Sequence, residues 1–171
     1  MKSRNVQLNL DHFRSPTKDE CFSLDILALD LVNYMAEEPN AQYVIGVGTD
    51  SQTYADKIVF ATAIFIHRVG LGGRYFYNRT FVKTIMFLRE RMHQEANLSL
   101  IVSEKLLEAL RSVIDNLELM NYAFEIHVDV GMNGDTRTVV KEIIGWLTSC
   151  GYIVKYKPDA PCASAIADKY T

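Results

Sequence analysis

Three consecutive stretches of the chain have the composition of β-strands and are joined by short links. The stretches cover residues 42–50, 57–67 and 73–83, and the links lie around residues 54–56 and 70–73. Links this short join antiparallel neighbours, because parallel neighbours need a crossover of about a dozen residues or more. The pattern therefore predicts three strands that pair as antiparallel hairpins.

The second half of the chain alternates helical and extended patterns. In order, it predicts a helix over 86–119, a strand over 124–131, a helix over 136–150, a strand over 152–157 and a helix over 162–170. A break in the long helix near Asn97 is left open, and Asp135 is the expected N-cap of the next helix. Strands reached through helices pair in parallel. We therefore expect an α/β fold with a mixed five-stranded sheet, three strands antiparallel and two parallel, flanked by helices.

The N-terminal segment predicts an additional helix. Thr17 and Glu20 have the spacing of a capping box, apolar residues recur at helical spacing after them, and Pro39 ends the pattern. We expect a helix over 16–38 within an N-terminal arm of residues 1–40, followed by the main domain over 41–171. The exposed stripe of this helix could pack on the domain or on a second copy, which leaves a homodimer open.

Composition limits the classes of function. The 171 residues suit one domain with an added arm, and the net charge of −3 requires any nucleic-acid site to be a local feature. Cys21, Cys150 and Cys162 are widely spaced and fit no zinc pattern, which favours a reduced intracellular protein. We find no signal-peptide pattern and no membrane-spanning apolar run, so we expect a cytoplasmic protein without membrane contact.

Acidic residues occur where several predicted elements should meet. Asp50 ends the first strand and Asp129 ends the fourth, so parallel pairing of these strands would bring both carboxylates to one sheet edge. Glu95 begins the apolar stripe of the long helix, where an acid needs a compensating partner. Asp168 lies in the last helix, and Asp159 is an alternative fourth acid. Taken singly, each acid has an ordinary explanation as a turn, a solvated helix residue or a surface residue.

Converging carboxylates predict a cation site. Like charges close together raise the pKa of at least one member, and a bound cation offsets their repulsion. Ligands that are all oxygen suit Mg²⁺ or Mn²⁺. Two such ions about 4 Å apart can activate water and stabilise the leaving oxygen in phosphodiester hydrolysis.

Four short motifs resemble the ribonuclease H-like superfamily over about residues 42–171. "GVGTDSQ" is similar to the first strand of that fold, "MHQEANLSLIVSEKLLEAL" to its first long helix, "IHVDVG" to its fourth strand and "SAIADKYT" to its last helix. The matching catalytic and metal-binding positions are Asp50, Glu95, Asp129 and Asp168. More narrowly, "VGTDSQ", "VDVG" and the closing "ASxxAD" resemble the YkuK-type family of bacterial proteins.

The resemblance implies a metal-dependent nuclease that hydrolyses RNA, DNA or their hybrid by a two-metal-ion mechanism. Asp50 and Asp129 would bind or bridge the ions, Glu95 would complete the site, and Asp168 would hold the second ion or assist product release. Water would attack phosphorus and leave a 3′-hydroxyl and a 5′-phosphate. Two alternatives stay open: a catalytically inactive module that binds nucleic acid or a protein, and an unrelated α/β protein whose acids are turns and caps.

Basic and aromatic residues alternate along the third predicted strand and into the long helix. They are Arg74, Tyr75, Phe76, Tyr77, Arg79, Phe81, Lys83, Arg89 and Arg91. Such interleaving can bind a nucleic-acid backbone and stack on bases. An ordinary strand with one buried face produces the same pattern, and we favour that interpretation.

Overall fold

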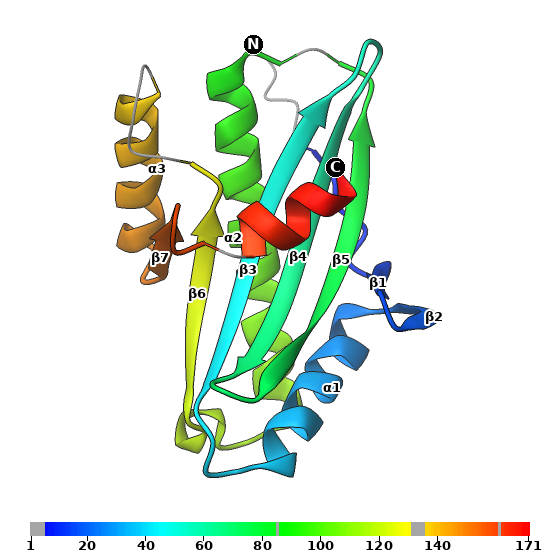
Figure 1. Ribbon diagram of the computed structural model, residues 1–171, viewed down its shortest axis with the longest axis vertical. Helices are drawn as coiled ribbons and strands as arrows, with labels where there is room; N and C mark the ends of the chain where they lie inside the picture. Colours follow the sequence, from blue (N-terminus) through cyan, green and yellow to red (C-terminus); the bar gives the residue numbers. More distant parts are fainter. Residues whose placement is uncertain (1–5, 85, 131–135, 161) are drawn as a thin grey trace.

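The computed structural model describes residues 6–84, 86–130, 136–160 and 162–171 and contains one mixed sheet flanked by helices (Figure 1). Seven strands lie in the order β2-β1-β5-β4-β3-β6-β7. The expected α/β class, with a mixed sheet and flanking helices, is confirmed. The sheet has two strands more than the expected five, and both come from the N-terminal segment.

The other five strands, β3 to β7, are those that the sequence predicts. β3 (Tyr43–Thr53), β4 (Ile58–Arg68) and β5 (Gly72–Val82) form consecutive antiparallel pairs. β6 (Tyr122–Val128) pairs in parallel with β3, and β7 (Ile153–Tyr156) pairs in parallel with β6. The change from antiparallel to parallel pairing therefore occurs at β3, the strand that carries Asp50.

The predicted N-terminal helix starts too early. Residues 13–22 instead form β1 (Phe13–Ser15) and β2 (Lys18–Phe22), and β1 pairs antiparallel with β5. Helix α1 (Leu24–Glu37) begins after Ser23, whose Oγ accepts a hydrogen bond from the backbone N–H of Ile26 at 3.3 Å. Phe13 and Phe22 are buried in the core, which explains why this segment joins the sheet instead of extending the helix.

Three helices, α1, α2 and α3, pack on one face of the sheet. The continuous helix α2 (Leu88–Val113) lies behind the sheet in Figure 1, so the break near Asn97 is absent, and it is followed by the single turn η1 (Leu117–Leu119). α1 packs against α2 in the same apolar core. α3 (Arg137–Ser149) joins β6 to β7 and packs in a second apolar cluster with the start of α2. None of the helices in the described parts of the chain is long and apolar enough to cross a bilayer.

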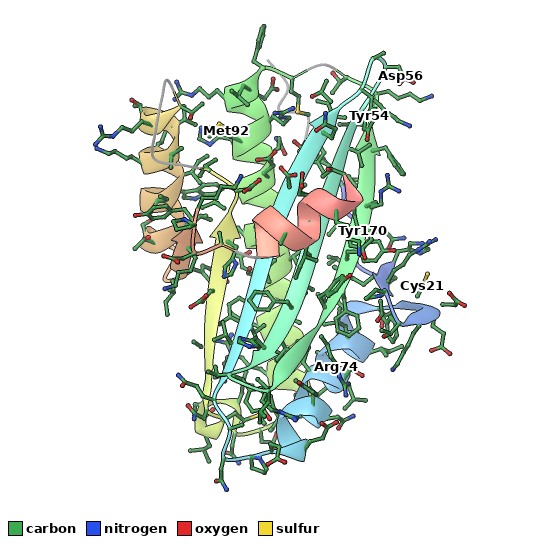
Figure 2. The ribbon with its side chains drawn as sticks, viewed as in Figure 1. Cys21, Tyr54, Asp56, Arg74, Met92 and Tyr170 are labelled. Carbon is green, nitrogen blue, oxygen red and sulfur yellow. The ribbon has the colours of Figure 1, made fainter. Side chains whose placement is uncertain are left out.

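The opposite face of the sheet carries small residues, which allow the C-terminal segment to pack closely on it. Gly46, Ala61 and Ala63 present little side-chain bulk, and Phe65 lies across Gly46 where a Cβ atom would collide with its ring. The C-terminal segment η2 (Cys162–Ala167) therefore packs closely on this face through Ala167. The following turn η3 (Asp168–Tyr170) ends beside β5, where Figure 2 shows Tyr170.

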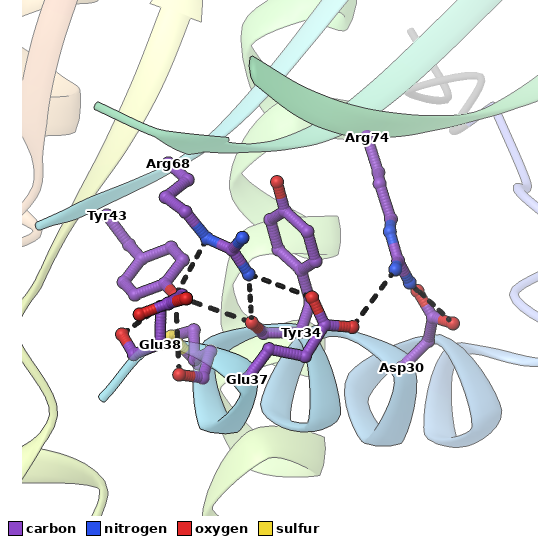
Figure 3. A network of polar contacts seen from close by, with 8 residues as sticks. Asp30, Tyr34, Glu37, Glu38, Tyr43, Arg68 and Arg74 are labelled. Atoms are coloured by element: carbon purple, nitrogen blue, oxygen red, sulfur yellow. Dashed lines mark hydrogen bonds and ion pairs between the residues drawn. The ribbon is translucent and has the colours of Figure 1, made fainter. Parts of the chain in front are cut away.

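Polar contacts fasten α1 to the sheet at the far end of the molecule (Figure 3). The Arg68 guanidinium donates to the Tyr43 hydroxyl at 3.1 Å, the Tyr34 carbonyl at 2.9 Å and the Glu37 carboxylate at 2.9 Å. Arg74 forms ion pairs with Glu37 and with Asp30. Arg74 thus belongs to the α1 interface, although the sequence pattern groups it with the candidate nucleic-acid-binding residues.

Candidate active site

Asp50 lies inside a strand at the point where its neighbours change. Parallel pairing of β3 with β6 ends at Thr49 opposite Val128, whereas antiparallel pairing with β4 continues to Thr53 opposite Ile58. The expectation that the strand ends in a turn at Asp50 is wrong, because β4 keeps the backbone extended for three more residues. The second neighbour stops just before Asp50, which leaves room beside its carboxylate.

Asp129 follows β6 directly and is the next residue in register with Asp50. Successive side chains along a strand alternate between faces, and the paired positions share a face, so both carboxylates emerge on the same side. The pKa of Asp50 is raised to about 6, mainly by burial and in smaller part by the charges of Asp129 and Asp168. The hydrogen bond from the Ser51 backbone and the charge of Arg91 act in the opposite direction.

Glu95 approaches the same place from α2. Ser51 donates a hydrogen bond from its Oγ to Glu95 Oε1 at 2.5 Å. Burial is the main cause that raises the pKa of Glu95 to about 8, and the charges of Asp50 and Asp129 add to it. Without a bound cation, Glu95 therefore holds its proton at neutral pH, which lowers the repulsion among the three acids.

The three acids line one cavity with a volume of about 250 Å³. Asp50, Glu95 and Asp129 line it, and its other walls are Leu88, Arg91, Met92, Val130 and Thr136. Across the described ranges, no group of three or more His, Cys, Asp or Glu side chains has an arrangement that could hold a metal ion. The acids are therefore gathered around one space without forming a ready-made coordination site.

A lysine that the sequence analysis did not single out lies among these acids. Lys157 Nζ is 2.9 Å from Asp129 Oδ1, and this contact is the main cause that raises the pKa of Lys157, with the charges of Asp50 and Asp168 adding to it. Asp129 Oδ1 is buried and lacks a well-aligned hydrogen bond within the described structure, so the ion pair only partly replaces its hydration. Lys157 directly follows β7, the last parallel strand. This position could have revealed it in the sequence, because the carboxyl ends of parallel strands converge.

The two candidates for the fourth acid, Asp168 and Asp159, both lie outside the cavity lining but differ in their influence on Asp50. Asp168 is exposed at the start of η3 and does not line the cavity, but its charge acts on both Asp50 and Lys157. Asp159 is exposed in the turn after β7, where its backbone N–H donates to the Tyr156 carbonyl at 2.8 Å. Asp168 is among the principal groups that influence Asp50, and Asp159 is not.

Buried hydroxyl groups connect α2 to the sheet beneath Glu95. Ser99 Oγ lies 3.0 Å from Thr49 Oγ1 and also 3.0 Å from the Glu95 carbonyl oxygen, and Thr49 lies 2.9 Å from Thr62 across the strand pair. These groups fix the height and rotation of α2 over β3. Their sequence signal is a serine four residues after Glu95 within an otherwise apolar stripe, which the sequence analysis did not use.

His127 is a buried residue of β6, the strand that neighbours β3. Its Nε2 lies 3.0 Å from Glu125 Oε2, and its ring lies 5.3 Å from the Phe65 ring. Burial lowers the pKa of His127. It supports the sheet beside the acids and does not line the cavity.

The family model described as Ribonuclease H-like matches residues 27–171, and the chain therefore belongs to this family of proteins. The match begins within α1, earlier than the resemblance in the sequence motifs. The chain is also similar to a Bacillus subtilis (strain 168) protein named Uncharacterized protein YkuK. The two are 34% identical over 145 residues, which make up 81% of this chain and 84% of the relative. Both resemblances identified from the sequence, to the superfamily and to the YkuK-type family, are thereby confirmed.

Proposed function

We propose that the chain is a metal-dependent nuclease that hydrolyses phosphodiester bonds of RNA or DNA. Asp50, Glu95 and Asp129 would be its metal ligands and catalytic acids, with Asp168 as the fourth. The main support is that three carboxylates from β3, α2 and the end of β6 line a single cavity. Family membership supports a role on nucleic acid, since nuclease activity is common among ribonuclease H-like proteins.

The chemistry of the donor groups suits Mg²⁺ or Mn²⁺. All the acids offer oxygen, the pKa values of Asp50 and Glu95 are raised, and Asp129 has a buried oxygen that no aligned donor satisfies within the described structure. These features indicate negative charge that the surrounding protein does not fully compensate. A bound divalent ion would polarise a phosphate oxygen and lower the pKa of a water molecule.

The chain's own residues would hold and orient the reacting groups. The extended backbone of β3 fixes Asp50, and the Ser51 hydroxyl aligns Glu95. Arg91 lines the cavity, donates to Thr53 Oγ1 at 2.8 Å, and has a buried Nε without a hydrogen-bond partner in the described structure. The part of the Arg91 guanidinium that lines the cavity is suited to a phosphate oxygen of the substrate.

Cleavage of a labelled panel tests the proposal. The panel contains an RNA–DNA hybrid, single-stranded RNA and DNA, duplex DNA and a four-way junction, each with Mg²⁺, Mn²⁺ or a chelator. We expect metal-dependent cutting that falls about 100-fold or more in Asp50→Asn, because even groups that only orient ligands are worth about 10–100-fold. Asp159→Asn is the matched control and should cut as well as the original chain. No cutting of any substrate, or equal cutting by Asp50→Asn, would reject the nuclease.

A catalytically inactive module that binds nucleic acid or a protein is the second candidate. Two observations favour it: the acids do not form a ready-made metal site within the described structure, and Lys157 is paired with Asp129. For this candidate, nucleic acid or a protein partner should bind without metal-dependent cleavage. Asp50→Asn should then leave binding unchanged or strengthen it by removing a negative charge.

A further inference from the structure

The sheet face that carries Asp50 continues toward a second pocket on β5. Asp50 is paired with Ala61 on β4, and Ala61 is paired with Arg79 on β5. Paired residues share a face, so Arg79 lies on the same side as Asp50. With about 4.8 Å between neighbouring strands, the two backbones are about 10 Å apart. Ala61, which lies between them, is buried under Ala167, so a ligand on β5 would reach the acidic cavity across the C-terminal segment.

A pocket of about 230 Å³ lies at this position. It is lined by His12, Arg14, Tyr77, Arg79, Phe81 and Tyr170. We call these six residues the cation–aromatic pocket. Three separate segments build it: the N-terminal arm, β5 and the C-terminal turn. Its volume is below the roughly 300–1,000 Å³ of pockets for drug-sized ligands, which suits one base or one sugar-phosphate unit.

One wall of the cation–aromatic pocket is rigid. The rings of Tyr77 and Tyr170 are stacked with centroids 3.5 Å apart and planes inclined by 9°. The Tyr170 hydroxyl lies 2.9 Å from the Tyr75 hydroxyl, and the Tyr54 hydroxyl donates to the Thr171 carbonyl at 3.1 Å. The C-terminal turn is thus held on the sheet between the pocket and Asp50.

The remaining aromatic residue presents its ring to solvent. Phe81 is 58% exposed, although an aromatic hydrocarbon side chain gains most from burial. Lys57 Nζ lies 5.6 Å from the ring centroid, and the Arg79 guanidinium lies 5.7 Å from it. An exposed ring flanked by cations matches the way in which proteins hold a base by stacking and its phosphate by charge.

The basic residues of this surface are not paired with carboxylates in the described structure, unlike several basic residues elsewhere in the chain. Arg14, Arg79, Lys57 and Lys169 form no ion pair within the described structure, whereas Arg68, Arg74 and Arg89 do. Arg14 and Arg79 line the pocket, and Lys169 lies on the C-terminal turn between the pocket and the acids. The chain has a net charge of −3, so this surface is a local concentration of positive charge on an otherwise acidic protein.

We propose that the cation–aromatic pocket binds an unpaired, single-stranded segment of RNA or DNA and leads the same strand toward the acidic cavity. Phe81 stacks on a base, and Arg14 and Arg79 bind phosphates. A single strand fits because the bases of a duplex are already stacked on one another and cannot cover the Phe81 ring. Binding in the pocket does not depend on the proposed nuclease function, and only the delivery of the strand to the acids rests on it.

Fluorescence anisotropy of the full chain in EDTA tests the proposal, because the chelator separates binding from cleavage. The probes are fluorescein-labelled oligouridylate and oligothymidylate of about twelve nucleotides, and a duplex of equal length. We expect both single strands to bind more tightly than the duplex. Phe81→Leu should weaken single-strand binding about tenfold, and Phe81→Trp should retain it, because stacking needs an aromatic ring. Since the Phe81 ring is exposed, neither change should alter the melting temperature.

Arg79→Ala tests the phosphate contact through salt dependence. Each lost contact should flatten the slope of log K against log salt concentration by about 0.7 for a single strand. Lys105→Ala is the matched control, because Lys105 is an exposed cation on α2 whose partner is Glu108. Its affinity should stay within about twofold of the original chain, below the tenfold change expected from a lost stacking contact.

The proposal is overturned if the original chain fails to bind either single strand, or if it binds the duplex equally well. It is also overturned if Phe81→Leu and Arg79→Ala bind like the original chain. Binding that depends on these residues without any metal-dependent cleavage would support the pocket and reject the nuclease. Cleavage that depends on Asp50, with binding that does not depend on Phe81 or Arg79, would support the nuclease and reject the pocket.

Discussion

Glu95 is held where its ionised form is unfavourable, which gives a stability prediction at the residue scale. Its pKa of about 8 in the folded chain exceeds the ordinary 4.5, so the folded state binds this proton more tightly than the unfolded state. The resulting stabilisation is complete below about pH 4.5 and is lost as the pH rises through 8. Glu95→Gln lacks this dependence and should be more stable than the original chain by several kcal/mol, up to about 5, at high pH.

Urea unfolding at pH 5, 7 and 9 measures this effect. The free energy of unfolding of Glu95→Gln minus that of the original chain should rise steadily across the series. Glu108→Gln provides the control, because Glu108 is exposed and paired with Lys105 at 2.7 Å. A difference for Glu95→Gln that does not change with pH would contradict the assignment of a proton to Glu95.

Lys157 gives a second prediction at the residue scale. Its ammonium lies among Asp129, Asp50 and Asp168 and would repel a cation entering the acidic cavity. Lys157→Met should therefore tighten Mn²⁺ binding about tenfold, which corresponds to about 1.4 kcal/mol. Isothermal titration with Mn²⁺ alone measures the affinity, and Lys105→Met should leave it unchanged. Weaker binding in Lys157→Met would show that the lysine supports the metal site.

At the scale of elements, Arg68 connects α1 to β3 and β4. The Arg68 side chain is only 12% exposed and donates to three acceptors, including the backbone of Tyr34. Arg68→Met removes three hydrogen bonds of a largely covered guanidinium, so we expect a loss of about 2–3 kcal/mol of unfolding free energy. For a chain of this size, the melting temperature should fall by roughly 4–12 °C.

Arg74→Met is the matched control for this prediction. Its side chain is 41% exposed, and exposed ion pairs contribute about 1 kcal/mol or less. Thermal denaturation followed by circular dichroism should separate the two variants clearly. Equal melting temperatures would mean that the Arg68 contacts add nothing beyond ordinary surface ion pairs.

The elements also show what could be predicted from sequence and why the rest could not. The long central strands carry strong apolar patterns, so their order and pairing followed directly. β1 and β2 are short and largely polar, and their place in the sheet depends on contacts between β1 and β5 that no local pattern contains. The position of Asp50 inside β3 depends in the same way on β4, since Asp and Ser are turn formers when considered alone.

Part of the candidate site could also be predicted from the expected topology. Asp50 and Asp129 were expected together because parallel strands share a carboxyl end, and the helical stripe identified Glu95. Lys157 was missed although it directly follows β7, because the sequence analysis considered only acids at the ends of the parallel strands. The N-cap expected at Asp135 lies outside the described residues.

At the scale of the whole molecule, we predict one cooperative unfolding transition. The main apolar core contains Phe13 and Phe22 of the N-terminal arm together with Leu31 of α1, Ile64 of β4 and Leu106 of α2. The predicted division into an arm over 1–40 and a domain over 41–171 should therefore not correspond to two units that unfold separately. Removal of the arm would expose the core.

Trp146 makes this measurable. It is the single tryptophan and lies in α3, within the second apolar cluster and away from the arm. Its fluorescence should change at the same urea concentration as the far-ultraviolet circular dichroism of the whole chain. Two separate midpoints would show that the arm, or α3, unfolds independently.

The anchoring of Thr171 has a practical consequence for every assay of this protein. The Tyr54 hydroxyl donates a hydrogen bond to the Thr171 carbonyl. Of the two preceding residues, Lys169 is a cation and Tyr170 lines the cation–aromatic pocket. An affinity tag or fluorescent protein fused after Thr171 would emerge between the acids and the aromatic rings, where it would obstruct the proposed path of a strand. Untagged protein is therefore the proper reagent, and inactivity of a fusion after Thr171 would report on the fusion rather than on the protein itself.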